Sequence, residues 1–277
     1  MNCKKKICQY TIYILFILLA GCSTSTNRSI PPTSTSIPTP SSLRFVNHLS
    51  PQVDTDFHSF DDSGCPADEY DFRKCKKGSP LFALGCDEIQ EPSNLLGSLE
   101  PEYPIALCVT ELQNLSGEID KIDDIEHISM GDYAYNPGGR YFFRDGGVRT
   151  VLFRYVMFKD NDFVLVETED EFREIFGPIE TQEEALGYVK AVTGLDEYYG
   201  LQPDPKLKYF VDDVVEDTYG KTVEDGYLVH LFHTDGYGCG PHPTSSVDFH
   251  VTPQGHLQQL GTEKVFTDPG KDQMCVD

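Results

Sequence analysis

The sequence lacks the short motifs that usually mark an enzyme or a nucleotide-binding protein. It contains no G-x-S-x-G nucleophile turn, no H-E-x-x-H zinc helix, no phosphate-binding P-loop and no EF-hand calcium loop. Each of these motifs places a fixed chemical device, such as an exposed nucleophile or a set of metal ligands, in a known structural context. Without them the hydrolase and nucleotide classes lose their usual support, and we expect no cofactor.

Basic residues are scarce relative to acidic ones. The 277 residues include 22 Lys and Arg against 45 Asp and Glu, which gives a formal net charge of −23. Such a surface repels nucleic acid and anionic lipid headgroups, and it favours cationic partners, divalent ions or solubility outside a cell. We therefore expect no nucleic-acid partner.

The first residues contain an apolar run that is too short to cross a membrane. Lys4, Lys5 and Lys6 precede Ile12–Ala20, whereas a transmembrane helix needs about 20 apolar residues. A basic start followed by a short apolar run is typical of a signal peptide.

The end of this run resembles the lipobox of bacterial lipoproteins. Leu19, Ala20, Gly21 and Cys22 match that pattern at all four positions. The resemblance implies a signal peptide over residues 1–21 and a lipid, such as palmitate, on Cys22. It also implies a lipid-anchored protein of the cell envelope that faces the periplasm or the cell exterior. The alternatives are an uncleaved anchor or an ordinary signal peptide.

The composition divides the rest of the chain into a tether and one domain. After Cys22, the segment up to residue 42 consists almost entirely of Ser, Thr and Pro, and it cannot bury enough apolar surface to fold. Residues 43–277 are long enough for a hydrophobic core and contain no second linker. We expect one exported domain with an irregular, cysteine-containing part at 43–100 and the sheet and helices at 103–277.

Alternating apolar residues and turn-forming residues predict an α+β fold, with a mainly antiparallel sheet, a few packed helices and disulfide bonds. Strands are expected at residues 104–109, 140–144, 148–158, 162–167, 209–215, 226–233, 247–251 and 256–266. Turns at 145–147 and 159–161 separate the three strands between 140 and 167, which predicts an antiparallel meander. The stretch 118–130 suits a helix or a strand equally well.

Two capping-box patterns predict two helices. Thr168 with Glu171, and Thr181 with Glu184, each place a hydroxyl and a glutamate three residues apart before an apolar periodic segment. We expect the first helix to end at Gly177 and the second to bury one face.

The cysteines that remain in a mature chain are even in number. Cys3 and Cys8 leave with the signal peptide, and Cys22 would carry the lipid. Those that remain are Cys65, Cys75, Cys86, Cys108, Cys239 and Cys275. In an oxidising compartment this set predicts three disulfides. Proximity favours Cys239 with Cys275 and pairing of the four upstream cysteines among themselves, although sequence alone permits other connectivities.

Histidines are concentrated near the C-terminal end. Imidazole is a common ligand of transition metals, and the candidate ligands are His230, His242, His250 and His256. They offer a zinc or copper site as an alternative. Scattered surface or loop histidines are the simpler interpretation.

The segment from Thr234 to Thr244 joins two predicted strands and is longer than a hairpin needs. It carries Tyr237 and His242 on a loop that Cys239 is expected to hold. Rigid loops with aromatic and polar residues are common binding sites, so Tyr237 and His242 are candidate binding residues.

The segment at about 178–262 resembles the PepSY-type domains of exported bacterial proteins. The similarity rests on Thr181-x-Glu183-Glu184-Ala185-Leu186 and on the turn from Val251 to His256. Those domains are linked with inhibition or regulation of proteases. The loop at 234–246 interrupts the pattern.

Together these features favour a non-catalytic binding or regulatory module that is held at a membrane by lipid and meets an envelope protein. A metal-binding envelope protein and an extracytoplasmic enzyme of unidentified class are the alternatives.

Overall fold

Two antiparallel sheets with helices packed against them make up most of the described chain. The computed structural model describes residues 43–51, 64–66, 73–111, 134–135, 137, 139–146 and 150–276. These residues belong to one compact unit, Pro38–Asp277. The arrangement confirms the predicted α+β class. The predicted signal peptide, the Cys22 lipidation site, the tether and the stretch 118–130 lie outside the described residues.

The first sheet is centred on one long strand. Its strands follow the order β2-β3-β4-β7-β6-β5, and β8 pairs with β7. They are β2 (Arg73–Lys74), β3 (Glu88–Gln90), β4 (Ile105–Glu111), β5 (Ala134–Tyr135), β6 (Phe143–Asp145), β7 (Val151–Lys159) and β8 (Asp162–Val166). Strand β7 pairs antiparallel with β4, β6 and β8. Strand β4 pairs along residues 151–157 of β7, so β6 and β8 share the other edge of β7 at its two ends. The three predicted strands therefore form two hairpins around β7 and not a meander, and the first of them begins only at Phe143.

The hairpin between β7 and β8 shows why its turn residues were recognisable. Asp160 and Asn161 both have positive φ angles, 54° and 63°. A two-residue turn of this type needs left-handed backbone at both positions, which Asp and Asn tolerate better than most residues. The predicted turn is confirmed.

The second sheet has the order β11-β12-β14-β15-β9. Its strands are β9 (Lys208–Tyr209), β11 (Tyr219–Val223), β12 (Gly226–Thr234), β14 (Thr244–Val251) and β15 (Leu257–Thr267). In β14, Val247, Phe249 and Val251 are buried whereas Asp248 and His250 are partly exposed. The predicted period of two thus places one face of β14 in the core.

One predicted strand is divided in the structure. The segment 209–215 forms the end of β9 and the start of β10 (Val214–Glu216). Strand β9 pairs with β15, whereas β10 pairs in parallel with β1 (Arg44–Val46). The backbone changes its hydrogen-bond partner within one alternating run, so residue pattern alone could not show the break. Strand β11 was not predicted.

The predicted pairing of Cys239 with Cys275 is confirmed, and the four upstream cysteines pair among themselves, as expected. Cys239 and Cys275 pair across β13 (Gly238–Cys239) and β16 (Cys275–Val276). The upstream cysteines pair as Cys65 with Cys75 and Cys86 with Cys108. The last bridge joins the turn after α1 (Pro80–Ala83) to β4. The two upstream bridges thus fix short, irregular segments to the first sheet.

Both predicted helices begin at their threonine caps. In α3 (Glu169–Phe176) the Thr168 hydroxyl accepts from the Glu171 amide, and the Glu171 carboxylate accepts in return from the Thr168 amide. In α4 (Gln182–Thr193) the Thr181 hydroxyl caps the helix in the same way, but the Glu184 carboxylate accepts from the amide of Glu180. Both helix starts were therefore predicted correctly, although in α4 the glutamate accepts from the residue before the cap and not from the cap itself.

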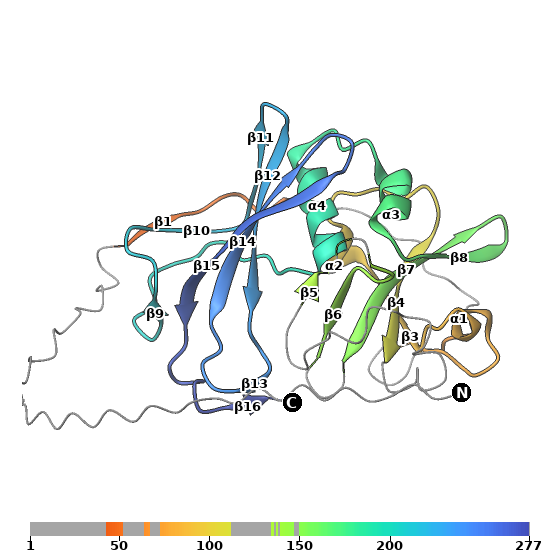
Figure 1. Cartoon of the computed structure of the whole chain (residues 1–277), viewed down its shortest axis with the longest axis horizontal. Helices are drawn as coiled ribbons and strands as arrows, with labels where there is room; N and C mark the ends of the chain where they lie inside the picture. The colour runs from red at the N-terminus through yellow and green to blue at the C-terminus, as the bar shows by residue number, and fades with distance from the viewer. Residues whose placement is uncertain are drawn as a thin grey trace, which may run out of the picture. The chain divides into compact units, whose positions relative to one another are not determined.

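Helix α4 lies between the two sheets and is buried on all sides (Figure 1). All residues from Ala185 to Thr193 are buried, whereas the sequence predicted a single buried face. Residues of both sheets, including Tyr155 and Phe249, belong to the same apolar cluster as α4. The short helix α2 (Ser93–Leu96) also packs against it. Sheets on two sides and a helix on a third cover positions that would face water on an ordinary surface helix.

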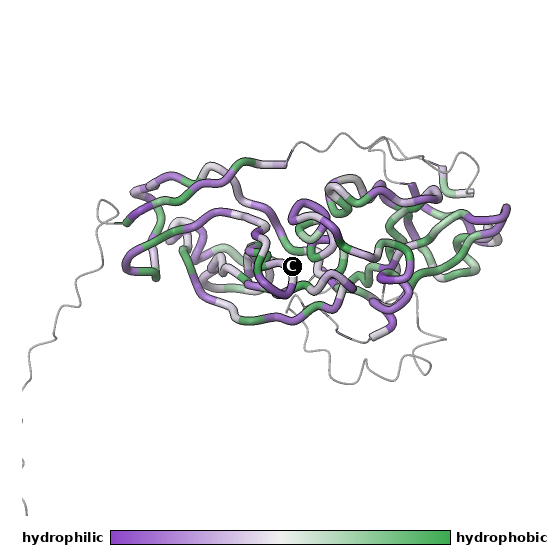
Figure 2. Tube along the Cα trace, turned by 90° about the horizontal axis from the view of Figure 1, so that it is seen from above, coloured by the Kyte–Doolittle hydropathy of each residue, from purple (hydrophilic) through white to green (hydrophobic). Residues whose placement is uncertain are grey.

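Hydrophobic residues are distributed in short stretches along the chain. Figure 2 shows these stretches interrupted by hydrophilic ones. Among the residues that the structure describes, no helix is long and apolar enough to span a bilayer.

Candidate functional site

The four histidines predicted as metal ligands each have separate partners. The Nδ1 of His230 lies 2.6 Å from Asp248 Oδ1, and its ring stacks on Tyr219 at 5.2 Å between ring centroids. The Nε2 of His250 lies 3.0 Å from Asp225 Oδ1. These two imidazoles are thus held by carboxylates on their own sheet.

The other two imidazoles contact different elements. The Nδ1 of His256 lies 3.3 Å from a guanidinium nitrogen of Arg173, on α3. His242 contacts two backbone carbonyls in the C-terminal part of the chain. Within the described ranges, no group of three or more His, Cys, Asp or Glu side chains is placed to hold a metal ion. The structure therefore does not bring the four predicted ligands together.

The candidate binding loop is held at several points. The Tyr237 hydroxyl donates to Asp145 Oδ1 at 2.8 Å. The pKa of Tyr237 is raised to about 12, mainly by partial burial and secondly by the Asp145 carboxylate. His242 Nδ1 lies 2.8 Å from the Asp235 carbonyl oxygen, and its Nε2 lies 3.2 Å from that of Met274. Both predicted binding side chains therefore make internal contacts that fix the loop, so neither is a free tip.

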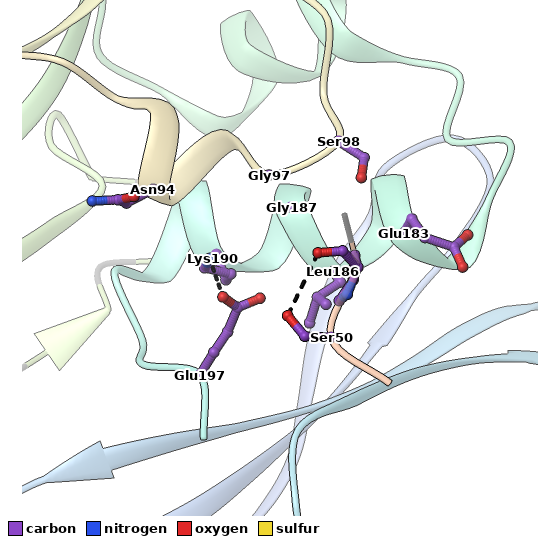
Figure 3. A pocket seen from close by; sticks show the side chains of 10 residues that line it. Ser50, Asn94, Gly97, Ser98, Glu183, Leu186, Gly187, Lys190 and Glu197 are labelled. Carbon is purple, nitrogen blue, oxygen red and sulfur yellow. Dashed lines mark hydrogen bonds and ion pairs between the residues drawn. The ribbon is translucent and has the colours of Figure 1, made fainter. Parts of the chain in front are cut away.

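A small polar cavity lies along α4 (Figure 3). None of the site residues predicted from the sequence lines it. Its volume is about 240 Å³. We call it the α4 cavity, and its lining residues are Ser50, Pro51, Asn94, Gly97, Ser98, Glu183, Leu186, Gly187, Lys190 and Glu197. Three segments that are distant in sequence therefore meet around it.

Two glycines bring the walls of the cavity together. A Cβ atom at Gly187 would lie 2.2 Å from the Leu96 carbonyl oxygen, which is closer than any real contact. Gly97 has a φ of +57°, and a Cβ there would lie 3.2 Å from the Gly187 Cα. Only glycine at both positions lets the turn after α2 rest directly on the α4 backbone.

An ion pair between the buried Lys190 and the half-buried Glu197 closes one end of the α4 cavity. Lys190 is 7% exposed, and its Nζ lies 2.7 Å from Glu197 Oε2. The Tyr199 hydroxyl donates to the other oxygen of Glu197 at 3.3 Å. Burial and then the Glu197 charge raise the pKa of Tyr199. Because a buried ammonium without a counter-charge is strongly destabilising, the contact with Glu197 compensates the buried side chain of Lys190.

Glu183 lies at the other end of the α4 cavity, in the first turn of α4. The Gln182 side-chain amide donates to it at 3.0 Å. Glu183 and Lys190 are seven positions apart, so they are separated by about two helical turns, or roughly 10 Å. The cavity therefore carries a paired charge at one end and a carboxylate without a cationic partner, among the described residues, at the other.

Two carboxyl groups outside the cavity have perturbed acidity. Burial is the main cause that raises the pKa of Glu169, whose carboxyl accepts a hydrogen bond from the Tyr135 hydroxyl. Partial burial also raises the pKa of Asp196, although much of this residue stays exposed. Neither residue lines the α4 cavity. The two carboxyl groups whose pKa values are raised therefore lie outside the cavity.

The sequence contained one signal for this cavity. A glycine within a helical pattern, as at Gly187, often has a packing or functional reason. The contribution of Ser50, Asn94 and Glu197 depends on tertiary contacts, which no local pattern reveals.

Comparison with known proteins gives no relative from which a function can be transferred. No protein-family model, no curated protein and no solved structure matches this chain. The similarity to PepSY-type domains remains a prediction, and any function must be argued from the α4 cavity and its chemistry.

Proposed function

We propose that this protein is a non-catalytic binding module of the cell envelope, anchored by lipid at Cys22. In this proposal the α4 cavity receives a side chain of an envelope protein. The observation that carries the proposal is the cavity itself, a preformed polar site with defined charges on a rigid helix.

The size of the cavity supports a protein partner. Sites for drug-sized small molecules usually have volumes of about 300–1,000 Å³. The α4 cavity, at about 240 Å³, is below that range. It suits one side chain, and such single anchors in pockets carry much of the binding energy in many protein interfaces.

The lining chemistry supports binding over catalysis. The ten lining residues include no histidine, cysteine or tyrosine, and the ammonium of Lys190 is already paired with Glu197. The serine hydroxyls of Ser50 and Ser98 have no imidazole beside them in this lining that could act as a general base. The perturbed carboxyl of Glu169 lies elsewhere in the fold.

The rigidity of the cavity also supports binding. Its long wall is α4, which is buried from Ala185 to Thr193. A site whose walls are already ordered loses little conformational entropy when it binds, and that preserves affinity for a small contact.

The lipid anchor is a separate part of the proposal, and Cys22 carries it. We expect the Cys22→Ala variant to incorporate no fatty acid and to leave the membrane or remain an uncleaved precursor. Labelling with radioactive fatty acid measures this directly. Equal labelling of the variant and the unchanged protein would contradict a lipid on Cys22.

Photo-crosslinking in intact envelopes tests the binding site. A photoreactive amino acid at Ser98, in the full-length chain and in its own membrane, should form an adduct with one envelope protein. A second probe at Asn94, on the same cavity, should form the same adduct.

The matched control is the same probe at Glu224, an exposed turn residue between β11 and β12 that does not line the cavity. It should give no such adduct. Equal adducts at Ser98 and Glu224, or none at either cavity position, would show that the α4 cavity is not the contact site.

A further inference from the structure

We infer that the α4 cavity binds a cationic side chain, lysine or arginine, presented by a basic segment of the partner protein. The inference rests on the proposed function of the cavity and adds the chemistry of the bound group. Three features of the site support it: its charges, its acceptor oxygens and the charge of the whole protein.

The charges that line the cavity leave one carboxylate available. Glu183, Lys190 and Glu197 are its charged side chains. Lys190 and Glu197 are 2.7 Å apart and compensate each other. Glu183 has the neutral amide of Gln182 as its partner, and no ion pair joins it to a cation in the part of the chain that the structure describes. The formal charges of these three side chains sum to −1, and Glu183 carries the charge that no cation compensates.

The positions of the polar groups favour a donor-rich ligand. Figure 3 shows Glu183 and Glu197 toward opposite ends of the cavity, with Ser50 and Ser98 between them. Serine hydroxyls offer acceptor oxygens, whereas ammonium and guanidinium groups carry only donors. The lining thus offers a cation both carboxylate and hydroxyl oxygens as acceptors.

An anionic ligand fits the same site poorly. To reach the ammonium of Lys190, a ligand carboxylate would have to compete with Glu197 at 2.7 Å. It would also meet the negative charge of Glu183 and leave Glu197 without its cation. Separating this pair is unfavourable because it leaves the half-buried Glu197 carboxylate with only the Tyr199 hydroxyl as its partner.

The charge of the whole protein acts in the same direction. The formal net charge is −23, and a strongly acidic protein raises the local concentration of cationic partners and their association rate. This attraction is screened by salt, with a screening length of about 8 Å at physiological ionic strength. Binding of a basic segment should therefore weaken as salt is added.

Peptide titration tests the inference on the isolated protein. Capped tripeptides Ac-Gly-X-Gly-NH2, with X as Arg, Lys, Gln or Glu, are added to the 15N-labelled protein and followed by NMR. We expect the Arg and Lys peptides to shift the amide signals of Gly97, Ser98 and Gly187. The Gln and Glu peptides should leave these signals unchanged at the same concentrations.

A pair of variants assigns the effect to one carboxylate. Glu183→Gln should weaken binding of the Arg peptide by about three- to tenfold, as expected for the loss of a half-buried charged hydrogen bond. Glu174→Gln makes the same charge change on an exposed residue of α3, outside the cavity. It should change the affinity by less than about twofold, through general attraction alone.

Several results would overturn the inference. They are equal shifts by the Arg and Gln peptides, tighter binding of the Glu peptide, shifts that map away from the cavity, and equal effects of the two variants. If the Ser98 crosslink to an envelope protein persists while the peptides fail, the cavity is a contact site but its ligand is not a cation. If that crosslink is also lost, the proposed function itself fails.

Discussion

At the scale of single residues, two buried tyrosines differ in whether their hydroxyl groups have a partner. Tyr155 and Tyr188 are both 0% exposed, and both rings pack on Phe172, with 5.1 and 5.5 Å between centroids. The Tyr155 hydroxyl donates to the Ala191 carbonyl oxygen at 2.8 Å. The Tyr188 hydroxyl has no hydrogen-bond partner among the described residues. Burial raises the pKa of both groups, so both are neutral under ordinary conditions.

These two tyrosines give a matched prediction. Tyr188→Phe removes a buried hydroxyl that has no partner, so the free energy of unfolding should stay within about 0.5 kcal/mol or rise. Tyr155→Phe removes a bonded hydroxyl and leaves the Ala191 carbonyl without that donor, which should cost about 1–2 kcal/mol. Urea unfolding of both variants measures the difference. If Tyr188→Phe costs as much as Tyr155→Phe, the Tyr188 hydroxyl has a stabilising partner.

The half-buried carboxyl of Glu169 predicts a pH-dependent difference in stability. Burial is the largest cause that raises its pKa, and the Tyr135 hydroxyl and Arg173 oppose the shift. A carboxyl whose pKa is raised on folding favours the folded state when it is protonated, and this contribution is lost as the pH rises through the folded-state pKa. Glu169→Gln should therefore raise the free energy of unfolding relative to the unchanged protein at pH 7.

The same difference should shrink at acidic pH. Below the ordinary glutamate pKa of about 4.3 the carboxyl is protonated in both states, so the variant and the unchanged protein should approach equal stability. Urea midpoints at pH 7 and at about pH 4 measure this. A variant that is less stable than the unchanged protein at pH 7 would show that the ionised Glu169 is stabilised by its partners.

At the scale of elements, the tightest approach between α2 and α4 is at Gly187. A Cβ at position 187 would meet the Leu96 carbonyl oxygen at 2.2 Å, and backbone cannot move aside as a flexible side chain can. Gly187→Ala should therefore force α2 away from α4. We expect a loss of about 2 kcal/mol or more in the free energy of unfolding, together with displaced amide signals at Gly97 and Ser98.

Gly261→Ala is the control for this change. Gly261 lies in the exposed part of β15, and a Cβ there would meet nothing within 4 Å. The free energy of unfolding of the Gly261→Ala variant should change by no more than about 0.5 kcal/mol, as for most surface substitutions. Equal losses in both variants would mean that the loss of glycine, rather than the clash with Leu96, determines stability.

Local signals in the sequence predicted elements whose limits are set locally. The caps at Thr168 and Thr181 began both helices, and the alternation in 247–251 gave the core of β14. The Asp160-Asn161 turn was recognisable because few residues accept positive φ angles. In each case a short run of residues contains the whole physical reason for the structure.

Features that depend on distant partners were not predicted. Strand β11 contains Gly220 and Lys221 and is stabilised mainly by pairing with β12. Helix α4 is buried all round because two sheets and α2 cover it. The α4 cavity joins residues near positions 50, 97 and 190, so no single segment contains its pattern. The candidate loop residues Tyr237 and His242 were visible in the sequence, but their internal partners Asp145 and Met274 were not.

At the scale of the whole molecule, the disulfides hold the segments that have little regular structure. The bridge between Cys86 and Cys108 ties the turn after α1 to the first sheet, and that between Cys239 and Cys275 ties the C-terminal strand β16 to the long loop. His242 reinforces the second tie through the carbonyl of Met274. Cys65, Cys86 and Cys108 are buried in a small apolar cluster, whereas Cys239 and Cys275 are exposed. Only at the second tie, therefore, does a covalent bond hold a segment that has little apolar burial.

This arrangement predicts a chain without free thiols among its six bridge-forming cysteines. Thiol titration of the denatured, unreduced mature protein should detect none of Cys65, Cys75, Cys86, Cys108, Cys239 and Cys275. Each bridge restricts the unfolded chain and should contribute about 2–4 kcal/mol, so reduction should lower the urea midpoint. Replacement of Cys239 and Cys275 by alanine should also increase amide exchange in β16 while that of β14 stays slow, because only the peripheral pairing is released. Two or more free thiols, or equally fast exchange in both strands, would contradict the structural role of these bridges.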